Sequence, residues 1–339
     1  MTTTPNTGGA NEVGTAASAV PTPAPAPPPD TPTVRNLVKH YGAVKAVDDV
    51  SMHCLPGEVL ALVGENGAGK STVAKMLAGA VSPTSGEITI GDRTVSVSNV
   101  SEARAIGIAC AFQELALVPE WTVAENLQLP GGRSFRTFSQ RKAVRAATET
   151  LQRLELDHID ASVPVSTLSL ADRQMVEIAR AISAKPQVLI LDEASSALAP
   201  PGVQWLFRRI RELTATGASV IYVSHRLGEL AEIADRGTVL RDGKVVGEFH
   251  RGAWTDDELI SLMAGREASK HYPEPAPKPV AGAEPVLEVE GLVSEGLNGV
   301  TLSIAPGEIL GVGGLQGHGQ AELLRALFGA TPATATSWR

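Results

Sequence analysis

A glycine-rich stretch, Gly-Glu-Asn-Gly-Ala-Gly-Lys-Ser at residues 64–71, carries the groups that could hold a chain of phosphates. It fits the pattern G-x-x-x-x-G-K-S, in which backbone N–H groups converge on phosphate oxygens and glycine allows close approach. Lys70 would reach the β and γ phosphates, and Ser71 would coordinate magnesium. The residues expected to contact the phosphates are Gly64, Glu65, Asn66, Gly67, Ala68, Gly69, Lys70, Ser71 and Thr72.

Two carboxylates follow a second apolar run, residues 188–191. Asp192 could hold magnesium through water, and Glu193 could orient or deprotonate an attacking water molecule. A strand that simply ends in acidic surface residues would show the same sequence pattern. This motif alone therefore leaves both the catalytic and the surface interpretation open.

Both motifs need elements that position them. Residues 58–64, EVLALVG, form the apolar and β-branched run of a buried parallel strand. Residues 70–79 place Val73, Met76 and Leu77 on one face of a helix that ends at Gly79. A strand, the loop and then a helix N-terminus make a phosphate site within an α/β fold.

Bulk composition narrows the class of protein. A chain of 339 residues, 43% hydrophobic and 19% charged, is predicted to be globular, with two domains or one domain and a partial one. Its apolar runs are far shorter than the roughly 20 residues of a membrane helix. The net charge of −8 argues against nucleic acid as a partner. Cys54 and Cys110 lie in apolar stretches, which favours core residues and a cytosolic location.

Composition also predicts the domain boundaries. Residues 1–30 lack the basic and apolar regions of a secretion signal and are rich in Pro, Ala, Thr and Gly, which predicts a disordered tail. Residues 31–270 form the first predicted domain, and residues 271–285 a proline-rich linker. Residues 286–330 begin a second domain, and residues 331–339 are expected to be an irregular tail.

An internal repeat relates the two predicted domains. Residues 50–80 align without a gap to residues 300–330, at a constant offset of 250. A repeat of this length predicts duplicated domains rather than a solenoid. In the second copy Gln320 stands at the lysine position and Ala321 at the magnesium-ligand position, so the cationic charge is gone.

The order of these motifs resembles the ATPase subunits of ATP-binding cassette (ABC) transporters, from about Thr33 to Glu267. The resemblance implies that Tyr41 in KHYGAVKAV stacks on adenine, and that Gln113 in CAFQELALVPEWTVAENL touches magnesium and reports to the membrane partner. It also implies that Ser169, in the signature-like LSLADRQMVEIARAI, binds phosphate, and that His225 in VIYVSHRLGEL contacts the γ phosphate. Taken singly, Tyr41 and His225 would be read as ordinary packing or surface residues.

The resemblance implies a P-loop NTPase fold: a mostly parallel core sheet, a small antiparallel β subdomain including residues 86–97, and a helical subdomain at about residues 115–183. A partial second cassette would follow. ATP and Mg²⁺ are the implied cofactors. Ser71, Gln113 and Asp192 are the implied metal ligands, and Glu193 and His225 the implied catalytic residues.

Finer tags, GENGAGKST, QMVEIARAI and LISLMAGRE, resemble the double-cassette ATPases of bacterial monosaccharide importers of the ribose, galactose and xylose type. Related nucleoside importers share much of these tags. The implied partners are membrane permease subunits, a second cassette and, indirectly, a periplasmic or surface sugar-binding protein, with the chain peripheral on the cytoplasmic face of the plasma membrane. Two alternatives remain: a cassette protein acting on ribosomes or DNA, and a nucleotide-binding product without ATPase activity of its own.

The chain departs from the common family pattern at several positions. Leu170 and Ala171 stand where two signature glycines are usual, Ala194 replaces a proline, and Ala199 replaces an aspartate. In the head-to-tail pairing of family ATPases, the altered signature would face the second loop, which lacks lysine. Few residues follow the linker, so we expect a truncated or frame-shifted cassette, or a fragment, with uncovered apolar faces. A short protein that docks onto another cassette is the competing interpretation.

Overall fold

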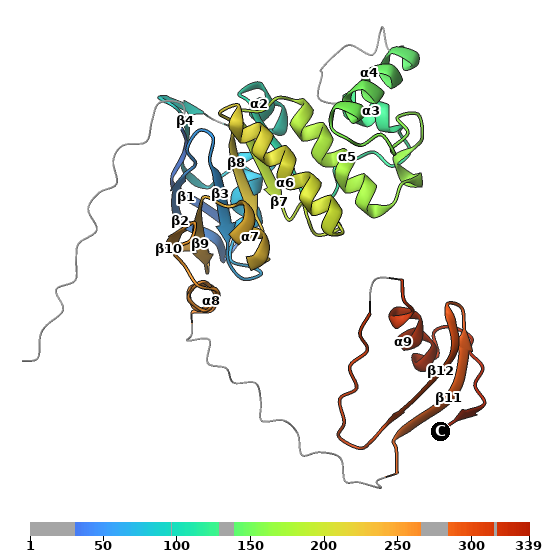
Figure 1. The fold of residues 1–339 in the computed structure, drawn as a ribbon. Helices are drawn as coiled ribbons and strands as arrows, with labels where there is room; N and C mark the ends of the chain where they lie inside the picture. The colour runs from blue at the N-terminus through green and yellow to red at the C-terminus, as the bar shows by residue number, and fades with distance from the viewer. Residues whose placement is uncertain (1–30, 96, 129–138, 266–283, 315–316) are drawn as a thin grey trace, which may run out of the picture. The chain divides into compact units, whose positions relative to one another are not determined.

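The computed structural model describes residues 31–95, 97–128, 139–265, 284–314 and 317–339. The chain divides into two compact units, residues 1–267 and 268–339, which Figure 1 shows in blue to orange and in red. The predicted N-terminal tail lies outside the described residues, as do residues 271–283 of the predicted linker.

A six-stranded sheet forms the centre of unit 1. Its strands follow the order β10-β9-β3-β8-β7-β6, and all neighbours are parallel except the antiparallel pair β9 and β10. The strands are β3 (Val59–Val63), β6 (Ile108–Ala111), β7 (Val188–Asp192), β8 (Ser219–Val223), β9 (Arg236–Arg241) and β10 (Lys244–His250). The predicted mostly parallel core sheet is therefore confirmed, with the strand from residues 58–64 at its middle.

An antiparallel sheet of four strands, ordered β2-β1-β4-β5, forms the second layer of unit 1. Its members are β1 (Pro32–Tyr41), β2 (Val44–His53), β4 (Ser85–Ile90) and β5 (Arg93–Val95). The last two strands form the expected antiparallel region at residues 86–97.

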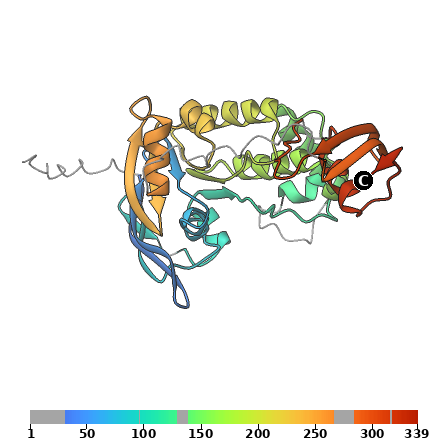
Figure 2. The same cartoon turned by 90° about the horizontal axis from the view of Figure 1, so that it is seen from below.

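Helices lie in the segments that connect the strands of unit 1 and in the segment after β10, and crossover segments of this kind join the parallel pairs. They are α1 (Lys70–Leu77), α2 (Val100–Ala105), α3 (Val123–Gln128), α4 (Gln140–Arg153), the 3₁₀ turn η3 (Val165–Thr167), α5 (Leu170–Ser183), α6 (Pro200–Ala215), α7 (Leu227–Ile233) and α8 (Asp256–Ala264). The elements α3, α4, η3 and α5 form the predicted helical subdomain. Helices α5 and α6 lie side by side in both views (Figures 1 and 2).

Two hydrophobic cores lie on opposite faces of the six-stranded sheet. One face, the helical core, presents Val59, Ala61, Val63, Leu189, Leu191, Val220 and Tyr222 to residues of α3 to α7. The other face, the antiparallel core, presents Leu60, Leu62, Ile190, Ile221 and Val223 to α1 and the antiparallel sheet. Successive strand side chains point to opposite faces, so β3, β7 and β8 contribute to both cores in alternation. Burying a Val or Leu side chain stabilises the fold by about 1.5–3 kcal/mol.

Unit 2 repeats the beginning of unit 1. Strands β11 (Leu287–Ser294) and β12 (Leu297–Ile304) form an antiparallel pair, and α9 (Gln320–Phe328) follows the second glycine-rich loop. Val289, Leu292, Leu297, Leu323 and Ala326 make a small core, so the expectation of wholly uncovered apolar faces is only partly right. Leu324 and Phe328 do remain exposed.

The segment equivalent to β3 is not a strand in unit 2. Ile309 is 93% exposed, whereas Val59, its counterpart 250 residues earlier, is 3% exposed. In unit 1 the pairing of β3 depends on β8 and β9, and the described part of unit 2 offers no parallel strand for residues 309–313 to pair with. The apolar pattern alone therefore does not make this segment a strand.

The expectation of an irregular tail at residues 331–339 is wrong for its last part. Ser337 and Trp338 form β13, which pairs with Glu290 and Val289 of β11. The outer edge of β11 carries backbone groups that need partners, and the end of the chain supplies them.

Two further expectations concern single residues and membrane spans. Cys54 and Cys110 are free thiols rather than a disulfide, as expected. Across the described ranges, no helix has the length and apolar character of a membrane span.

Candidate functional site

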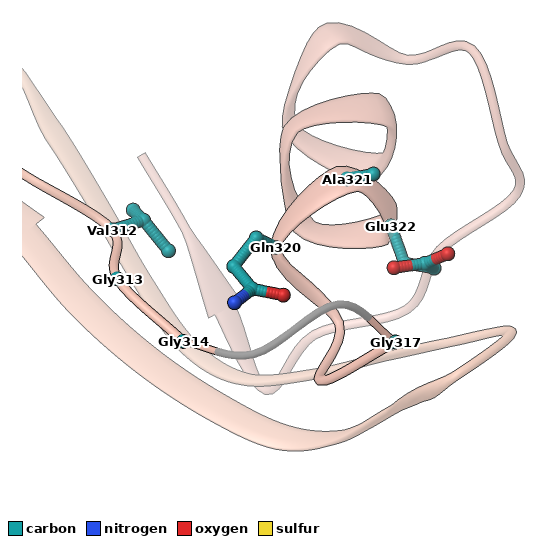
Figure 3. Close-up of a pocket in the computed structure, with 7 residues that line it drawn as sticks. All are labelled: Val312, Gly313, Gly314, Gly317, Gln320, Ala321 and Glu322. Carbon is teal, nitrogen blue, oxygen red and sulfur yellow. The ribbon is translucent and has the colours of Figure 1, made fainter. Parts of the chain in front are cut away.

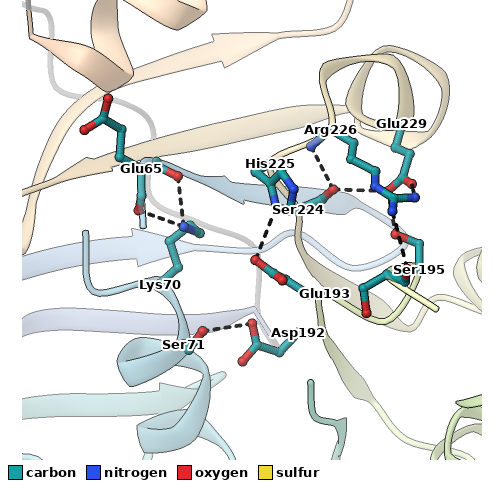
Figure 4. A network of polar contacts seen from close by, with 12 residues as sticks. Glu65, Lys70, Ser71, Asp192, Glu193, Ser195, Ser224, His225, Arg226 and Glu229 are labelled. Carbon is teal, nitrogen blue, oxygen red and sulfur yellow. Dashed lines mark hydrogen bonds and ion pairs between the residues drawn. The ribbon is translucent and has the colours of Figure 1, made fainter. Parts of the chain in front are cut away.

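The first glycine-rich loop joins β3 to α1, and the side chain of its lysine, Lys70, is hydrogen-bonded to the backbone of the loop. Lys70 is the first residue of α1 and is 5% exposed. Its Nζ donates to the carbonyl oxygens of Gly64 at 2.8 Å and Glu65 at 2.9 Å (Figure 4). Burial lowers the pKa of Lys70, and the carboxylates of Glu193 and Asp192 act in the opposite direction. The amine is thus held at the mouth of a helix N-terminus, where an anion would meet it.

The glycines of this loop are required for two different reasons. A Cβ on Gly64, whose φ is +152°, would lie 2.2 Å from the carbonyl oxygen of Leu240. Gly67 has a φ of +86° and open space around the same position. Gly64 therefore lets the loop pass close to β9, while Gly67 leaves the loop backbone accessible from outside.

The magnesium-ligand candidates on the loop and on β7 already contact each other. Ser71 Oγ donates to Asp192 Oδ1 at 3.1 Å, although the two residues are 121 positions apart (Figure 4). Asp192 is 1% exposed. Burial raises the pKa of its carboxyl group, and the hydrogen bond from Ser71 acts in the opposite direction. Hydroxyl and carboxylate oxygens suit Mg²⁺, which usually binds one or two carboxylates together with phosphates and waters.

Glu193 and His225 form the other half of the cluster. Glu193 directly follows β7 and His225 follows β8, and His225 Nδ1 lies 3.2 Å from Glu193 Oε1. The backbone of Glu193 has a φ of +49°, which is uncommon outside glycine. Because β7 and β8 are neighbours and parallel, their carboxyl ends place both side chains beside Asp192.

Two other predicted residues, Tyr41 and Gln113, lie at a strand end and on a loop. Tyr41 ends β1 with its ring half exposed and Lys39 Nζ 5.2 Å from the ring centre. Gln113 lies on the exposed loop after β6, the strand that pairs with β7. The structure thus brings Lys70, Ser71, Asp192, Glu193 and His225 into one cluster, and leaves Tyr41 at an edge.

Ser169, the signature serine, is engaged by its own helix. It is the N-cap of α5, where its Oγ accepts from the backbone N–H of Asp172 and donates to Asp172 Oδ2 at 2.6 Å. His158 Nε2 lies 3.0 Å from the other oxygen of Asp172. The S-x-x-D spacing is a capping signal that the sequence already displayed.

A second polar cluster beside Glu193 and His225 was not predicted from the sequence. The carboxylate of Glu229, on α7, contacts Ser195, Ser224 and Arg226 (Figure 4). It also accepts from Tyr222 OH. No motif marks these residues, because the cluster depends on the adjacency of β7 and β8.

Two glycines of the second glycine-rich loop keep the positive φ of their counterparts in the first, and the position of Lys70 is taken by Gln320. Gly317 and Gly67 share a φ of +86°, and Gly319 and Gly69 have φ values of +96° and +101°. The loop borders a cavity of about 650 Å³, whose lining residues are Val312, Gly313, Gly314, Gly317, Gln320, Ala321 and Glu322 (Figure 3). Its described lining carries one acidic side chain and no basic one, which disfavours a triphosphate.

Comparison with known proteins agrees with this geometry. Residues 47–196 match the family model of the ABC transporter, and this range holds the first phosphate loop, Gln113, Ser169 and the two carboxylates. The chain carries an ABC transporter ATPase domain.

The relatives of this ABC cassette include curated import proteins. The chain is 46% identical over 304 residues to the ribose import ATP-binding protein RbsA 1 of Rubrobacter xylanophilus, covering 88% of this chain and 60% of the relative. It is 42% identical to a protein of the same name from Rhizobium johnstonii, covering 87% of this chain and 58% of that one. The chain thus spans about three fifths of the length of these relatives.

Solved structures similar to this cassette are themselves ABC cassettes. One is an ATP-binding cassette of an ABC transporter in its ADP conformation, with 26% identity and a TM-score of 0.58, covering 70% of this chain and 95% of that one. Another is a dimeric cassette in a post-hydrolysis state, bound to ADP and phosphate, with 25% identity and a TM-score of 0.59. It covers 66% of this chain and 100% of that one. The fold is therefore that of an ABC cassette P-loop NTPase.

Proposed function

We propose that unit 1 binds ATP with Mg²⁺ and hydrolyses it, as the energy-coupling subunit of a monosaccharide importer. The observation that carries this proposal is the group of polar side chains at the carboxyl ends of β3, β7 and β8. There Ser71 contacts Asp192, His225 contacts Glu193, and both carboxylates act on the charge of Lys70. In open α/β sheets ligands bind at this edge.

Nucleotide binding would use the loop and the helix that follows it. Lys70 would exchange its bonds to the Gly64 and Glu65 carbonyl oxygens for bonds to the β and γ phosphates. The loop residues Gly64 to Thr72 would supply backbone N–H groups, and Tyr41, whose ring is half exposed, would stack on adenine.

Mg²⁺, when bound, would neutralise charge that develops on the phosphate oxygens. Ser71 and Asp192 would hold it, and Gln113 would join them from the loop after β6. In the described ranges no group of three or more His, Cys, Asp or Glu side chains is placed to hold a metal. The Ser71–Asp192 pair would therefore need phosphate oxygens to complete the metal site.

Hydrolysis would use the second half of the cluster. Glu193 would accept a proton from the attacking water, and His225, 3.2 Å away, would contact the γ phosphate and fix the orientation of Glu193. A second cassette would supply a signature serine equivalent to Ser169 on the opposite side of the nucleotide.

The transport role comes from the relatives. They are named as ribose import ATP-binding proteins, so we propose a monosaccharide such as ribose as the cargo. The partners would be permease subunits in the plasma membrane, a second cassette and, indirectly, a periplasmic or surface sugar-binding protein. The chain would lie on the cytoplasmic face and contact the membrane through the permease.

A second candidate is nucleotide binding with little turnover by this chain alone. The Ser169 hydroxyl already donates to Asp172, and a carboxylate beside the signature would repel a phosphate of the facing site. The second loop, with Gln320 in place of lysine, would add no cation.

Equilibrium titration of the full chain with Mg-ATP tests the binding site. Lys70→Ala should abolish saturable binding, because it removes the cation of the loop. Lys142→Ala removes the same charge from an exposed position on α4 and should bind like wild type. Equal affinity of the Lys70→Ala and Lys142→Ala variants would rule out this site.

Hydrolysis is tested separately, by single-turnover measurement with protein in excess over ATP. Glu193→Gln should retain binding and lose turnover, because it removes the proton acceptor alone. Turnover that survives in Glu193→Gln would exclude Glu193 as the base. A wild-type chain that binds ATP without turnover would favour the second candidate.

A further inference from the structure

A buried carboxylate on α7 collects four side-chain donors. Glu229 is 9% exposed. Its Oε2 accepts from Ser195 Oγ at 2.7 Å, Tyr222 OH at 2.6 Å and Ser224 Oγ at 3.1 Å. Its Oε1 accepts from an Arg226 guanidinium nitrogen at 3.1 Å. Both oxygens of a desolvated carboxylate are thus satisfied by donors.

Three of the four donors, Ser195, Ser224 and Arg226, come from the two loops that carry the proposed reacting groups, and Tyr222 lies on β8 itself. Ser195 lies two residues after Glu193 on the loop that follows β7, and Ser224 immediately precedes His225 on the loop that follows β8. Arg226 immediately follows His225, and its guanidinium also donates to the carbonyl oxygen of Ser196 at 3.4 Å. The two loops are therefore tied together through Glu229 and Arg226.

Glu193 has a local reason to need such a tie. Its φ of +49° is strained for a residue with a side chain, and strained backbone persists where the surroundings fix it. The backbone N–H of Glu193 donates to the Val223 carbonyl oxygen at 3.0 Å, which links the same two loops at the strand ends. The hydrogen bond from Ser195 to Glu229 fixes the same loop two residues after Glu193.

We propose that Glu229 is a positioning residue, which holds Glu193 and His225 in the relative orientation that ATP hydrolysis requires. The inference rests on the proposed function, because it assigns a purpose to the separation of 3.2 Å between those two side chains. Glu229 contacts neither the phosphate loop nor Asp192 in the described hydrogen bonds, so it acts on turnover rather than on nucleotide binding.

Glutamine is the informative substitution, because it keeps the shape and changes the donor pattern. An amide carries one acceptor oxygen and one donor nitrogen. If the NH₂ group replaces Oε1 it faces the Arg226 donor, and if it replaces Oε2 its two N–H groups can donate to at most two of the three hydroxyls, which would then have to accept rather than donate. In either orientation Glu229→Gln breaks part of the tie between the loops.

Glu58 offers a matched control in the same unit. It is 8% exposed, and its carboxylate accepts from Arg236 Nε at 2.9 Å and from the backbone N–H of Leu55 at 2.6 Å. It stands just before β3, at the end of that strand opposite the phosphate loop. Glu58→Gln therefore removes a buried, arginine-paired carboxylate away from Glu193 and His225.

Amide hydrogen exchange of the full chain tests the tie without any turnover. Glu229→Gln should raise deuterium uptake in peptides covering residues 193–199 and 224–229, and leave residues 54–60 unchanged. Glu58→Gln should give the reverse pattern. Faster exchange throughout unit 1 in Glu229→Gln would show a general stabilising role and overturn the proposal, as would unchanged exchange in both loops.

Separate measurements of Mg-ATP affinity and of the single-turnover rate test whether Glu229 acts on hydrolysis rather than on binding. In Glu229→Gln, the dissociation constant for Mg-ATP should stay within about twofold of wild type, while the single-turnover rate falls roughly tenfold or more. Glu58→Gln should retain the wild-type rate. A parallel loss of affinity and rate would overturn the positioning role. A wild-type chain that binds ATP without turnover would contradict the proposed hydrolysis instead, and the exchange data alone would then decide whether Glu229 holds the loops.

Discussion

Gly64→Ala and Gly67→Ala make a matched pair, because both add one methyl group to the same loop. A Cβ on Gly64 would meet the Leu240 carbonyl oxygen at 2.2 Å, whereas a Cβ on Gly67 has nothing within 4 Å. Leu240 belongs to β9, which is hydrogen-bonded to β3 directly before the loop, so the oxygen cannot retreat without disturbing the sheet. The two variants share a positive φ and differ in the clash.

The expected losses of stability follow from the positive φ and from the clash with Leu240. Each variant holds alanine at a φ that side chains rarely adopt, which costs about 1–3 kcal/mol. Gly64→Ala adds an overlap that needs a shift of about 1 Å, and overpacking of this kind costs about 1–3 kcal/mol more. We therefore expect Gly64→Ala to lose about 2–6 kcal/mol in the free energy of unfolding, and Gly67→Ala about 1–3 kcal/mol.

Urea unfolding followed by tryptophan fluorescence measures the difference. Three of the four tryptophans, Trp121, Trp205 and Trp254, lie in unit 1, so the signal reports mainly on that unit. Gly64→Ala should unfold at a clearly lower urea concentration than Gly67→Ala, with similar slopes. Equal midpoints for the two variants would refute the argument that β9 confines the loop at Gly64.

Three further predictions concern buried polar groups. Because burial raises the pKa of Asp192 above its ordinary 3.8, the folded state binds this proton more tightly than the unfolded state, and stability due to the group falls as pH rises above 3.8. Asp192→Asn should therefore unfold at a higher temperature than wild type at pH 7, with an advantage that shrinks toward pH 4 in calorimetry; a constant advantage would contradict the shift. Arg180→Met should cost about 3–5 kcal/mol in urea unfolding, because it leaves the fully buried Glu177 without its partner at 2.6 Å, and the double variant Arg180→Met with Glu177→Leu should recover most of that loss. Burial raises the pKa of the Cys54 thiol to about 12, so this thiol should resist a thiol reagent at pH 8 until urea unfolds unit 1, and rapid labelling of the folded chain at Cys54 would count against its burial.

The sequence predicted the elements that carry the phosphate loop well. The apolar run of residues 58–64 and the helical face of Val73, Met76 and Leu77 correspond to β3 and to the buried side of α1. These signals are local, since periodicity and glycine spacing act within one strand, loop and helix. The pairing of Ser71 with Asp192 was implied by their shared chemistry and found as a hydrogen bond.

Other features could not be predicted because they depend on strand order. Glu229 meets Ser195 across 34 residues only because β7 and β8 are adjacent, and no periodicity in the sequence encodes that adjacency. The same dependence explains residues 309–313, which share the apolar pattern of β3 and lack its neighbours in the described part of unit 2. The Ser169–Asp172 cap is different, because its four-residue spacing was readable and its effect on the signature hydroxyl was missed.

The alternation of β3 between the two cores carries an evolutionary consequence. Ala61 faces the helical core while Leu60 and Leu62 face the antiparallel core, so adjacent codons are selected against different sets of contacts. Among natural variants, a volume change at Leu62 should be accompanied by compensating changes at Leu60 or Val223 and be statistically independent of Ala61. The two faces of β3 can then change independently in evolution. The phosphate loop, which follows β3, starts from the same place on the sheet in either case.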